Sequence, residues 1–407
     1  MKFKNIFLSS VVLVLLTTNL LAQITPQKLD SLVQQTLDSF DVPGISVGIF
    51  KDSVVYEKGY GVRSLKTNKP MNMNTLVGIA SNSKGFTCFA LGMLVDEGKL
   101  NWDDKVKKYI PEFQLKDPFA TEEFTVRDLV THRSGLPLGA GDLMFFPDGN
   151  DFNVQDVINN VKYLEPETSF RTTFRYNNNM FIIAGEILKR ISGVSWEEFI
   201  ENRIMKPVGM TSSKAAYHRI KDKSNIIDAH ATADGKVIAI PHDWSKTADA
   251  AGGIVSNIPD MLTWAEFLMN GGITKSGKRL ISKKQMHNLW SLQMPINVSE
   301  NNPYNTHFRG YGLGWFLSDV NGYKEVTHTG GLLGTVTQFT MIPELKLAIV
   351  VLTNQMSGAA FYTITNTIKD SYLGYEDRNW LQNYSAKNKE FIGYNDSIKK
   401  AVYAQVE

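Results

Sequence analysis

Ser81 and Lys84 are the two residues whose types and spacing point most directly to chemistry. They stand in Ser81-Asn82-Ser83-Lys84, ahead of an apolar stretch with helical periodicity. A serine at a helix start and a lysine one turn later lie on the same helix face. A lysine whose pKa is lowered by burial can take the serine proton, while the helix N-terminus favours the developing anion. The pattern suggests a nucleophilic serine, although taken alone it also fits a serine N-cap followed by a solvated lysine.

Tyr176-Asn177-Asn178 is a second segment with suitable side chains, just before a predicted helix over 180–191. A tyrosine phenolate held near a lysine can act as a general base, and the asparagine two residues later can point into the same cleft. The alternative is an ordinary loop with a packed aromatic ring.

His328-Thr329-Gly330-Gly331 is the third segment, on a predicted strand. A strand edge presents backbone N–H groups, so that of Gly331 could join that of Ser81 as an oxyanion hole. His328 and Thr329 would then bind the polar end of a substrate. The alternative is a strand histidine followed by a glycine turn.

The three segments together, in this order and spacing, resemble the pattern of serine β-lactamases and penicillin-binding proteins. That pattern combines Ser-x-x-Lys, a Ser/Tyr-x-Asn element and a Lys-Thr-Gly-type strand. The chain is similar to the class C β-lactamase-related serine hydrolases, a group that includes DD-peptidases, D-aminopeptidases and esterases. The similarity covers roughly residues 26–375 and includes segments 42–46, 59–62, 125–136, 251–254 and 311–315.

This resemblance implies an α+β fold of the β-lactamase/transpeptidase-like type. An antiparallel sheet flanked by helices would pack against an inserted helical lobe, with the cleft between them. The implied reaction is hydrolysis of an amide or ester bond in a small-molecule or peptide substrate, through an acyl-enzyme and without a cofactor. The implied roles are Ser81 as nucleophile, Lys84 as its proton partner, Tyr176 as general base, Asn178 as a contact to substrate and lysine, and His328, Thr329 and Gly331 as substrate-binding residues.

His328 is a departure from the family pattern, because β-lactamases of this group have lysine there. Histidine has an unperturbed pKa of about 6.5 and is mostly neutral near pH 7. This departure from lysine argues against strong β-lactamase activity. We also expect selectivity for carboxylate-bearing substrates over a neutral ester to fall as the pH rises from about 5.5 to 8. β-Lactams, D-amino-acid peptides and small esters all remain candidate substrates.

Ser46 lies in a motif that points to a different enzyme class. Gly44-Ile45-Ser46-Val47-Gly48 matches the G-x-S-x-G nucleophile elbow of α/β-hydrolases. That elbow requires a strand, a sharp turn and then a helix, whereas here the residues continue into a predicted hairpin. We interpret Ser46 as a strand residue without a catalytic role.

His132 and Cys88 are interpreted as structural residues. His132 precedes Gly135 at a predicted helix end, and Cys88 lies in an apolar helical pattern typical of a buried small hydrophobe. The seven histidines are scattered, with no pair at metal-ligand spacing. No catalytic metal or cofactor is predicted.

Hydrophobic patterns of period two occur near both ends of the chain, whereas helical patterns fill the middle. Strands at both ends predict one antiparallel sheet closed by the two termini, with a helical lobe at about 106–245 inserted between them. The predicted helices are 26–40, 81–97, 180–191, 257–270 and 357–372, and the predicted strands are 44–50, 53–62, 311–318, 323–329, 335–342 and 346–353.

Residues 1–22 are typical of a secretory signal peptide. Lys2 and Lys4 precede a largely apolar run, and Ala22 could be the last residue before cleavage. We expect export to the periplasm or the exterior, the alternative being an uncleaved anchor helix. The domain would then span 23–376, followed by a polar tail at 377–407 without an assigned role.

The composition narrows the function classes further. The formal net charge is +2, and removing Lys2 and Lys4 leaves 41 basic and 41 acidic residues, so no nucleic-acid footprint is indicated. A hydrophobic share of 43% supplies a sizeable core. Two alternatives stay open: a carboxylesterase of the same family, and a non-catalytic peptidoglycan-binding or sensor relative. The latter would usually lack one of Ser81, Lys84 and Tyr176. The oligomeric state is not indicated.

Overall fold

The computed structural model describes residues 23–147, 149, 151–242, 245–376 and 378–390. The predicted signal peptide at 1–22 lies outside the described residues. The predicted tail at 377–407 is described over 378–390. Within the described ranges, no helix has both the length and the apolar character needed to cross a bilayer.

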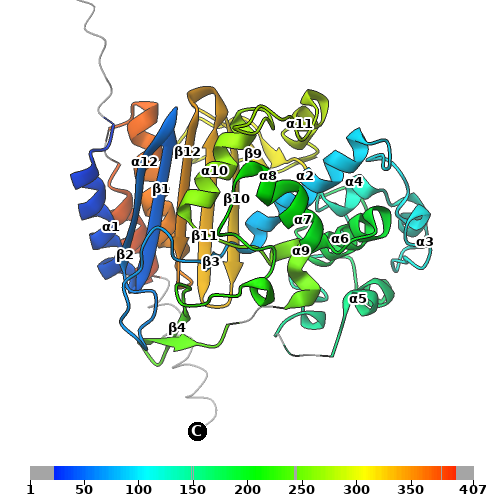
Figure 1. Ribbon diagram of the computed structural model, residues 1–407, viewed down its shortest axis with the longest axis horizontal. Helices are drawn as coiled ribbons and strands as arrows, with labels where there is room; N and C mark the ends of the chain where they lie inside the picture. Colours follow the sequence, from blue (N-terminus) through cyan, green and yellow to red (C-terminus); the bar gives the residue numbers. More distant parts are fainter. Residues whose placement is uncertain (1–22, 148, 150, 243–244, 377, 391–407) are drawn as a thin grey trace, which may run out of the picture.

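An eight-stranded antiparallel sheet forms the centre of the molecule (Figure 1). Its order is β2-β1-β12-β11-β10-β9-β8-β7, so the first strand of the chain pairs with the last. This pairing of Ile45 with Thr353 closes the sheet with both ends of the chain, which confirms the predicted arrangement. The strands are β1 (Gly44–Lys51), β2 (Ser53–Gly61), β7 (Met294–Pro295), β8 (Arg309–Tyr311), β9 (Phe316–Val320), β10 (Tyr323–Leu332), β11 (Thr335–Ile342) and β12 (Leu347–Thr353).

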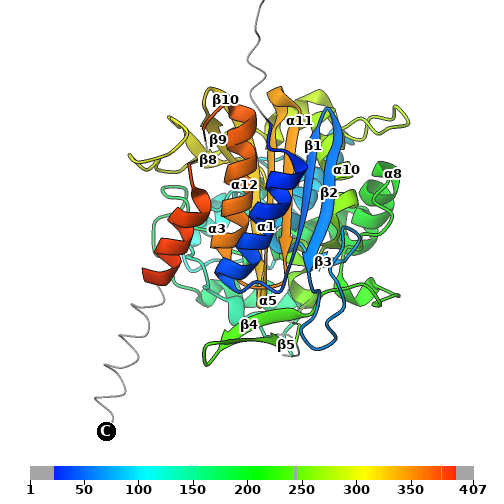
Figure 2. The same ribbon diagram turned by 90° about the vertical axis from the view of Figure 1, so that its left-hand side faces the viewer.

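Helices cover both faces of this sheet, which confirms the predicted α+β class. The helices α1 (Pro26–Phe40) and α12 (Gly358–Leu373) lie side by side on one face (Figure 2). The helix α10 (Ile258–Met269) packs on the other face, close enough that a Cβ at Gly48 would lie 2.5 Å from Ile258 Cγ2.

The helix α2 (Ser83–Asp96) lies between the sheet and a group of shorter helices (Figure 1). Its residues 83–94 are all buried, as expected for a helix that is apolar on every side. Thr87 Oγ1 joins it to the shorter helices by donating to Ala250 O and accepting from Trp196 Nε1. The shorter helices are α3 (Pro118–Glu123), α4 (Val126–Leu129), α5 (Val154–Asn160), α6 (Asn179–Ser192), α7 (Trp196–Ile200), α8 (Lys206–Val208) and α9 (Asp249–Gly252), and α11 (Lys283–Leu289) follows α10.

The predicted strand at 311–318 is wrong, because a turn at 312–315 separates β8 from β9. Gly314 has a left-handed φ of +79°, and a Cβ there would lie 2.8 Å from Lys84 O. The Trp315 ring lies against Gly85, where a Cβ would lie 2.4 Å from the ring. The chain turns here because α2 approaches too closely for a continuous strand.

Two other predicted boundaries also change. The helix predicted from residue 81 begins as a 3₁₀ turn, Ala80–Asn82, and becomes α-helical at Ser83. The strand predicted to end at 329 continues to Leu332, so Gly330 and Gly331 belong to β10 and do not form a turn. The predicted hairpin of β1 and β2 and the helices α1, α6, α10 and α12 are confirmed to within one or two residues.

The described part of the tail packs on α12, a contact that the weakly patterned sequence did not predict. Residues 380–390 are helical. Trp380 Nε1 donates to Asp370 Oδ2 at 2.6 Å, and Asn366 Nδ2 donates to Tyr384 OH at 3.1 Å. This segment therefore extends the helical cover of the sheet, on the face away from α2.

Candidate active site

Ser81 lies in the 3₁₀ turn that leads into α2. Ala80 before it adopts a left-handed φ of +48°, a strained conformation for a residue with a side chain. The turn is held to β11, because Asn82 Nδ2 donates to Ile79 O at 3.1 Å and to Thr337 Oγ1 at 2.9 Å. These contacts place Ser81 on the wall of a pocket.

Lys84 is fully buried behind Ser81, and its Nζ is held by three oxygen atoms. The distances are 3.0 Å to Ser81 Oγ, 2.9 Å to Asn178 Oδ1 and 2.8 Å to Ala251 O. Burial lowers the pKa of Lys84 to about 7, while the charge of Asp142 opposes that change. A neutral amine has two N–H donors and one lone pair. Asn178 and Ala251 can only accept from it, so the lone pair is left for the proton of Ser81.

Tyr176 stands on the other side of Ser81, where its half-buried phenol lines the pocket. Its ring stacks on His132 at 4.0 Å between centroids, and Lys84 Nζ lies 5.0 Å from the ring centroid. Burial raises the pKa of Tyr176, although the nearby Ser81 side chain lowers it in part. The hydroxyl is therefore protonated near neutral pH, so its chemistry starts from the phenol and not from a phenolate.

His132 supports Tyr176 from behind and does not line the pocket. Its φ is +55°, and its Nδ1 accepts from the backbone N–H of Asn177 at 3.2 Å. Burial lowers the pKa of His132 well below its usual value, so its ring is neutral. It acts as a packing surface for the tyrosine.

His328 lies on β10 with both ring nitrogens engaged. Nδ1 lies 2.6 Å from Thr329 O, and Nε2 lies 3.0 Å from the hydroxyl of the buried Tyr311. A carbonyl can only accept, so Nδ1 is protonated and Nε2 accepts from Tyr311. Burial, and then the charge of Lys84, lower the pKa of His328 to about 3. The expectation of a histidine that titrates between pH 5.5 and 8 is wrong, because burial shifts the pKa of His328 far below its unperturbed value.

Gly330 allows β10 to approach the turn that holds Ser81. A Cβ at Gly330 would lie 2.2 Å from Ile79 O, so no other residue fits this contact. Pairing with β9 ends at Thr327, which leaves one edge of β10 free beyond that residue. In an antiparallel ladder the backbone groups alternate in direction, and Gly331 shares the direction of Thr327. The N–H of Gly331 therefore points to the free edge, where it lines the pocket with Ser81.

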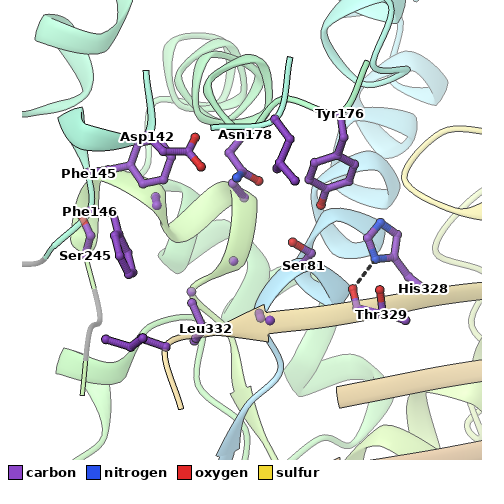
Figure 3. A pocket seen from close by; sticks show the side chains of 18 of the residues that line it. Ser81, Asp142, Phe145, Phe146, Tyr176, Asn178, Ser245, His328, Thr329 and Leu332 are labelled. Carbon is purple, nitrogen blue, oxygen red and sulfur yellow. Dashed lines mark hydrogen bonds between the residues drawn. The ribbon is translucent and has the colours of Figure 1, made fainter. Parts of the chain in front are cut away.

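The pocket has a volume of about 780 Å³ (Figure 3). Ser81, Tyr176, Asn178, His328, Thr329 and Gly331 all line it, and Lys84 lies directly behind Ser81. Ser46 does not line this pocket. It is buried in β1, and its hydroxyl is 3.4 Å from Asn72 O. The structure thus brings the seven predicted residues together and leaves the G-x-S-x-G serine outside the site.

Several pocket residues were not predicted. Asp142, Phe145 and Phe146 come from the loop between α4 and α5, and no motif in the sequence marks them. Tyr311 binds His328, and the carbonyl of Ala251 binds Lys84. Both residues lie in segments that carry the family resemblance, so closer attention to those segments could have found them. Across the described part of the chain, no group of three or more His, Cys, Asp or Glu side chains could hold a metal ion.

The imidazole of His328 should remain neutral throughout the pH range in which the enzyme is handled. Since its pKa is about 3, we expect ¹⁵N NMR to show one Nδ1-protonated tautomer from pH 8 down to about pH 5. The His328→Gln spectrum assigns the signal. A His328 resonance that titrates with a midpoint near 6.5 would contradict the engaged, buried ring.

Comparison with known proteins gives consistent matches over most of the chain. The family model described as Beta-lactamase matches residues 29–373. An unguisins hydrolase from Aspergillus campestris is 28% identical over 347 residues, which cover 81% of this chain and 61% of that protein. Protein flp from Staphylococcus aureus is 25% identical over 330 residues, covering 81% of this chain and 62% of that protein. The chain thus spans less than two thirds of the length of these two relatives.

Solved structures resemble the fold as well. The octameric penicillin-binding protein homologue from Pyrococcus abyssi superimposes with a TM-score of 0.75 at 28% identity, covering 87% of this chain and 78% of that one. The crystal structure of SurE superimposes with a TM-score of 0.68 at 18% identity, a likeness of fold alone.

Proposed function

The chain belongs to the beta-lactamase family of serine hydrolases, and from this we propose that it cleaves an amide or ester bond through an acyl-enzyme on Ser81. One observation carries the proposal. The buried amine of Lys84, with a pKa of about 7, lies 3.0 Å from Ser81 Oγ while two other oxygens occupy its N–H donors. This arrangement supports proton transfer from the hydroxyl to the amine.

The proposed acylation step moves one proton in two stages. Lys84 takes the proton of Ser81 as Oγ attacks the substrate carbonyl, and the N–H groups of Ser81 and Gly331 stabilise the oxyanion. The proton then passes from the Lys84 ammonium through the Tyr176 hydroxyl to the leaving group, which departs as an amine or alcohol. In deacylation a water molecule attacks the acyl-enzyme and loses a proton to the pair of Tyr176 and Lys84. The pair returns a proton to Ser81 Oγ when the acid leaves.

Lys84, and not Tyr176, is the general base in this proposal. The resemblance implied a tyrosine base, which requires a phenolate near neutral pH. Burial raises the pKa of Tyr176 while it lowers that of Lys84 to about 7. The amine is therefore the group whose proton affinity matches the task. Tyr176 acts as the proton relay to the leaving group.

The lining of the pocket supports a substrate without a carboxylate next to His328. The neutral imidazole offers no charge there, and its nitrogens are bonded to Thr329 and Tyr311. This favours an amidase, peptidase or carboxylesterase over an enzyme for β-lactams. The non-catalytic alternative loses support because Ser81, Lys84 and Tyr176 are all present and in contact.

We also propose that residues 1–22 direct export to the periplasm or the exterior. The support is in the sequence: two lysines followed by an apolar run that ends at Ala22.

The proposed acyl-enzyme can be tested by how it partitions between attack by water and attack by hydroxylamine. An ester and an anilide with the same acyl group should give one ratio of hydroxamate to acid when hydroxylamine competes with water, because both substrates pass through the same acyl-Ser81 species. Product analysis by liquid chromatography gives the ratio for each leaving group. A ratio that depends on the leaving group would contradict a common intermediate, and an absence of hydrolysis of both substrates would favour the non-catalytic relative.

A further inference from the structure

Asp142 places a carboxylate in the pocket that the proposed chemistry does not use (Figure 3). It lies in the short 3₁₀ turn Asp142–Met144, in the loop between α4 and α5. The nearby Asn178 side chain lowers the pKa of this carboxylate in part. Its Oδ1 atom is buried and has no hydrogen-bond partner among the described residues. A buried carboxylate oxygen without a donor is costly, so a donor from a bound molecule would be favourable there.

Asp142 is also the residue that gives the pocket its charge. Among the described residues that line the pocket there is no lysine or arginine, and the acids are Asp142 and Asp249. Burial, and then the charge of Glu197, raise the pKa of Asp249 well above its usual value. The ionised form is therefore disfavoured more strongly at Asp249 than at Asp142, which leaves Asp142 as the main anionic side chain that lines this pocket.

Asp142 lies on the side of the pocket where the acyl part of the substrate would bind. The leaving group must lie beside Tyr176, which delivers its proton, and Tyr176 stands on the same side of Ser81 as His328 (Figure 3). Asp142 stands on the opposite side, with Phe145 and Phe146 (Figure 3). The acyl part, which extends away from the leaving group, therefore points to a carboxylate next to two aromatic rings.

We propose that Asp142 binds an ammonium group on the acyl part of the substrate, which makes aminoacyl amides or esters with an apolar side chain the preferred substrates. The inference rests on the proposed function and names the substrate class for the same site. An ammonium N–H would complete the hydrogen bonding of Asp142 Oδ1, and the apolar side chain would lie against Phe145 and Phe146.

The electrostatics of Asp142 agree with this assignment. Burial raises the pKa of Asp142, and the nearby Asn178 side chain and the charge of Lys84 lower it in part. A bound cation would further favour the ionised carboxylate. A carboxylate-bearing acyl group would instead be repelled at the same position.

A matched set of anilides tests the proposal. Phenylalanine p-nitroanilide in both configurations is compared with its N-acetyl derivative and with 3-phenylpropionyl p-nitroanilide, which lacks the amine. At about pH 7, below the usual α-amino pKa of roughly 7.7 to 8.0, the amine is charged. We expect kcat/KM for one configuration of the amine to exceed that of the deamino compound by roughly 10²-fold, the effect of a hydrogen bond to a buried charge. The N-acetyl derivative should lose this advantage.

Asp142→Asn should remove the preference for the amine. We expect the ratio of amine to deamino kcat/KM to fall to within a few-fold of one, because any effect of the lost charge on Lys84 is common to both substrates and cancels in the ratio. Fluorophosphonate labelling of Ser81 shows that the variant still folds with a reactive serine. Asp38→Asn, which makes the same charge change on the exposed face of α1, should leave the ratio unchanged.

Three outcomes would overturn the inference. An amine that gives the parent enzyme no advantage, with Ser81 labelled and the deamino compound hydrolysed, overturns it and leaves the proposed function standing. A ratio that Asp142→Asn does not change, or an equal loss for both compounds, overturns it as well, because Asp142 would then act through Asn178 and Lys84. An unlabelled Ser81 with every anilide intact overturns the proposed function and this inference together.

Discussion

Ser81→Ala should lower hydrolysis of every substrate by roughly six orders of magnitude, as expected when the nucleophile of a serine hydrolase is removed. Ser81 Oγ is the hydroxyl that lies 3.0 Å from the Lys84 amine, and alanine offers no group that could replace its attack. The same substitution should abolish covalent labelling by a fluorophosphonate. Mass spectrometry of the labelled parent enzyme should place the adduct on the peptide that contains Ser81.

Ser46→Ala is the matched control for this experiment. Ser46 is fully buried in β1 and belongs to the competing G-x-S-x-G motif. Its weak contact to Asn72 O predicts full activity and full labelling for the variant. An adduct on Ser46, or labelling that survives in Ser81→Ala, would contradict the assignment of the nucleophile.

Lys84→Met should lower kcat/KM by roughly 10²- to 10⁴-fold, the usual effect of losing a positioned proton-transfer group. It should also change the pH profile. In the parent enzyme kcat/KM should rise as the pH increases through about 7, because the deprotonated amine is the base and its fraction grows above its pKa. Methionine fills a similar volume and cannot titrate, so the variant should lack this rise. Kinetics at a series of pH values, with circular dichroism to confirm folding, measure both effects.

Tyr176→Phe separates the two candidate bases. If Lys84 is the base, this variant should turn over more slowly and keep the rise through about pH 7, because the amine still titrates. Loss of the rise in Tyr176→Phe, combined with its persistence in Lys84→Met, would assign the base to Tyr176 and contradict the proposed mechanism.

Local spacing in the chain was enough to predict the nucleophile segment and most of the elements. Ser81 and Lys84 are one turn apart, so any helix starting there brings them to one face. The runs rich in β-branched and aromatic residues at β1, β2, β11 and β12 predicted strands, because such side chains pack well on a pleated sheet. The strand predicted at 311–318 is wrong because a contact distant in the sequence decides the structure there. Its turn follows from the close approach of α2 to Gly314, a contact between residues far apart in the sequence.

The sequence alone also predicted that the seven site residues belong together, through their order and the resemblance to a family. It could not predict their protonation states. The pKa values of Lys84 and His328 depend on burial in the folded chain, whereas the reference values that a sequence offers apply to solvated side chains. Asp142 was missed because its role depends on an unpartnered oxygen and on the absence of cations among the described pocket residues. Residue types and spacing define which groups are available for chemistry, but desolvation and the neighbours supplied by folding set their charges, and those charges select the base and the substrate.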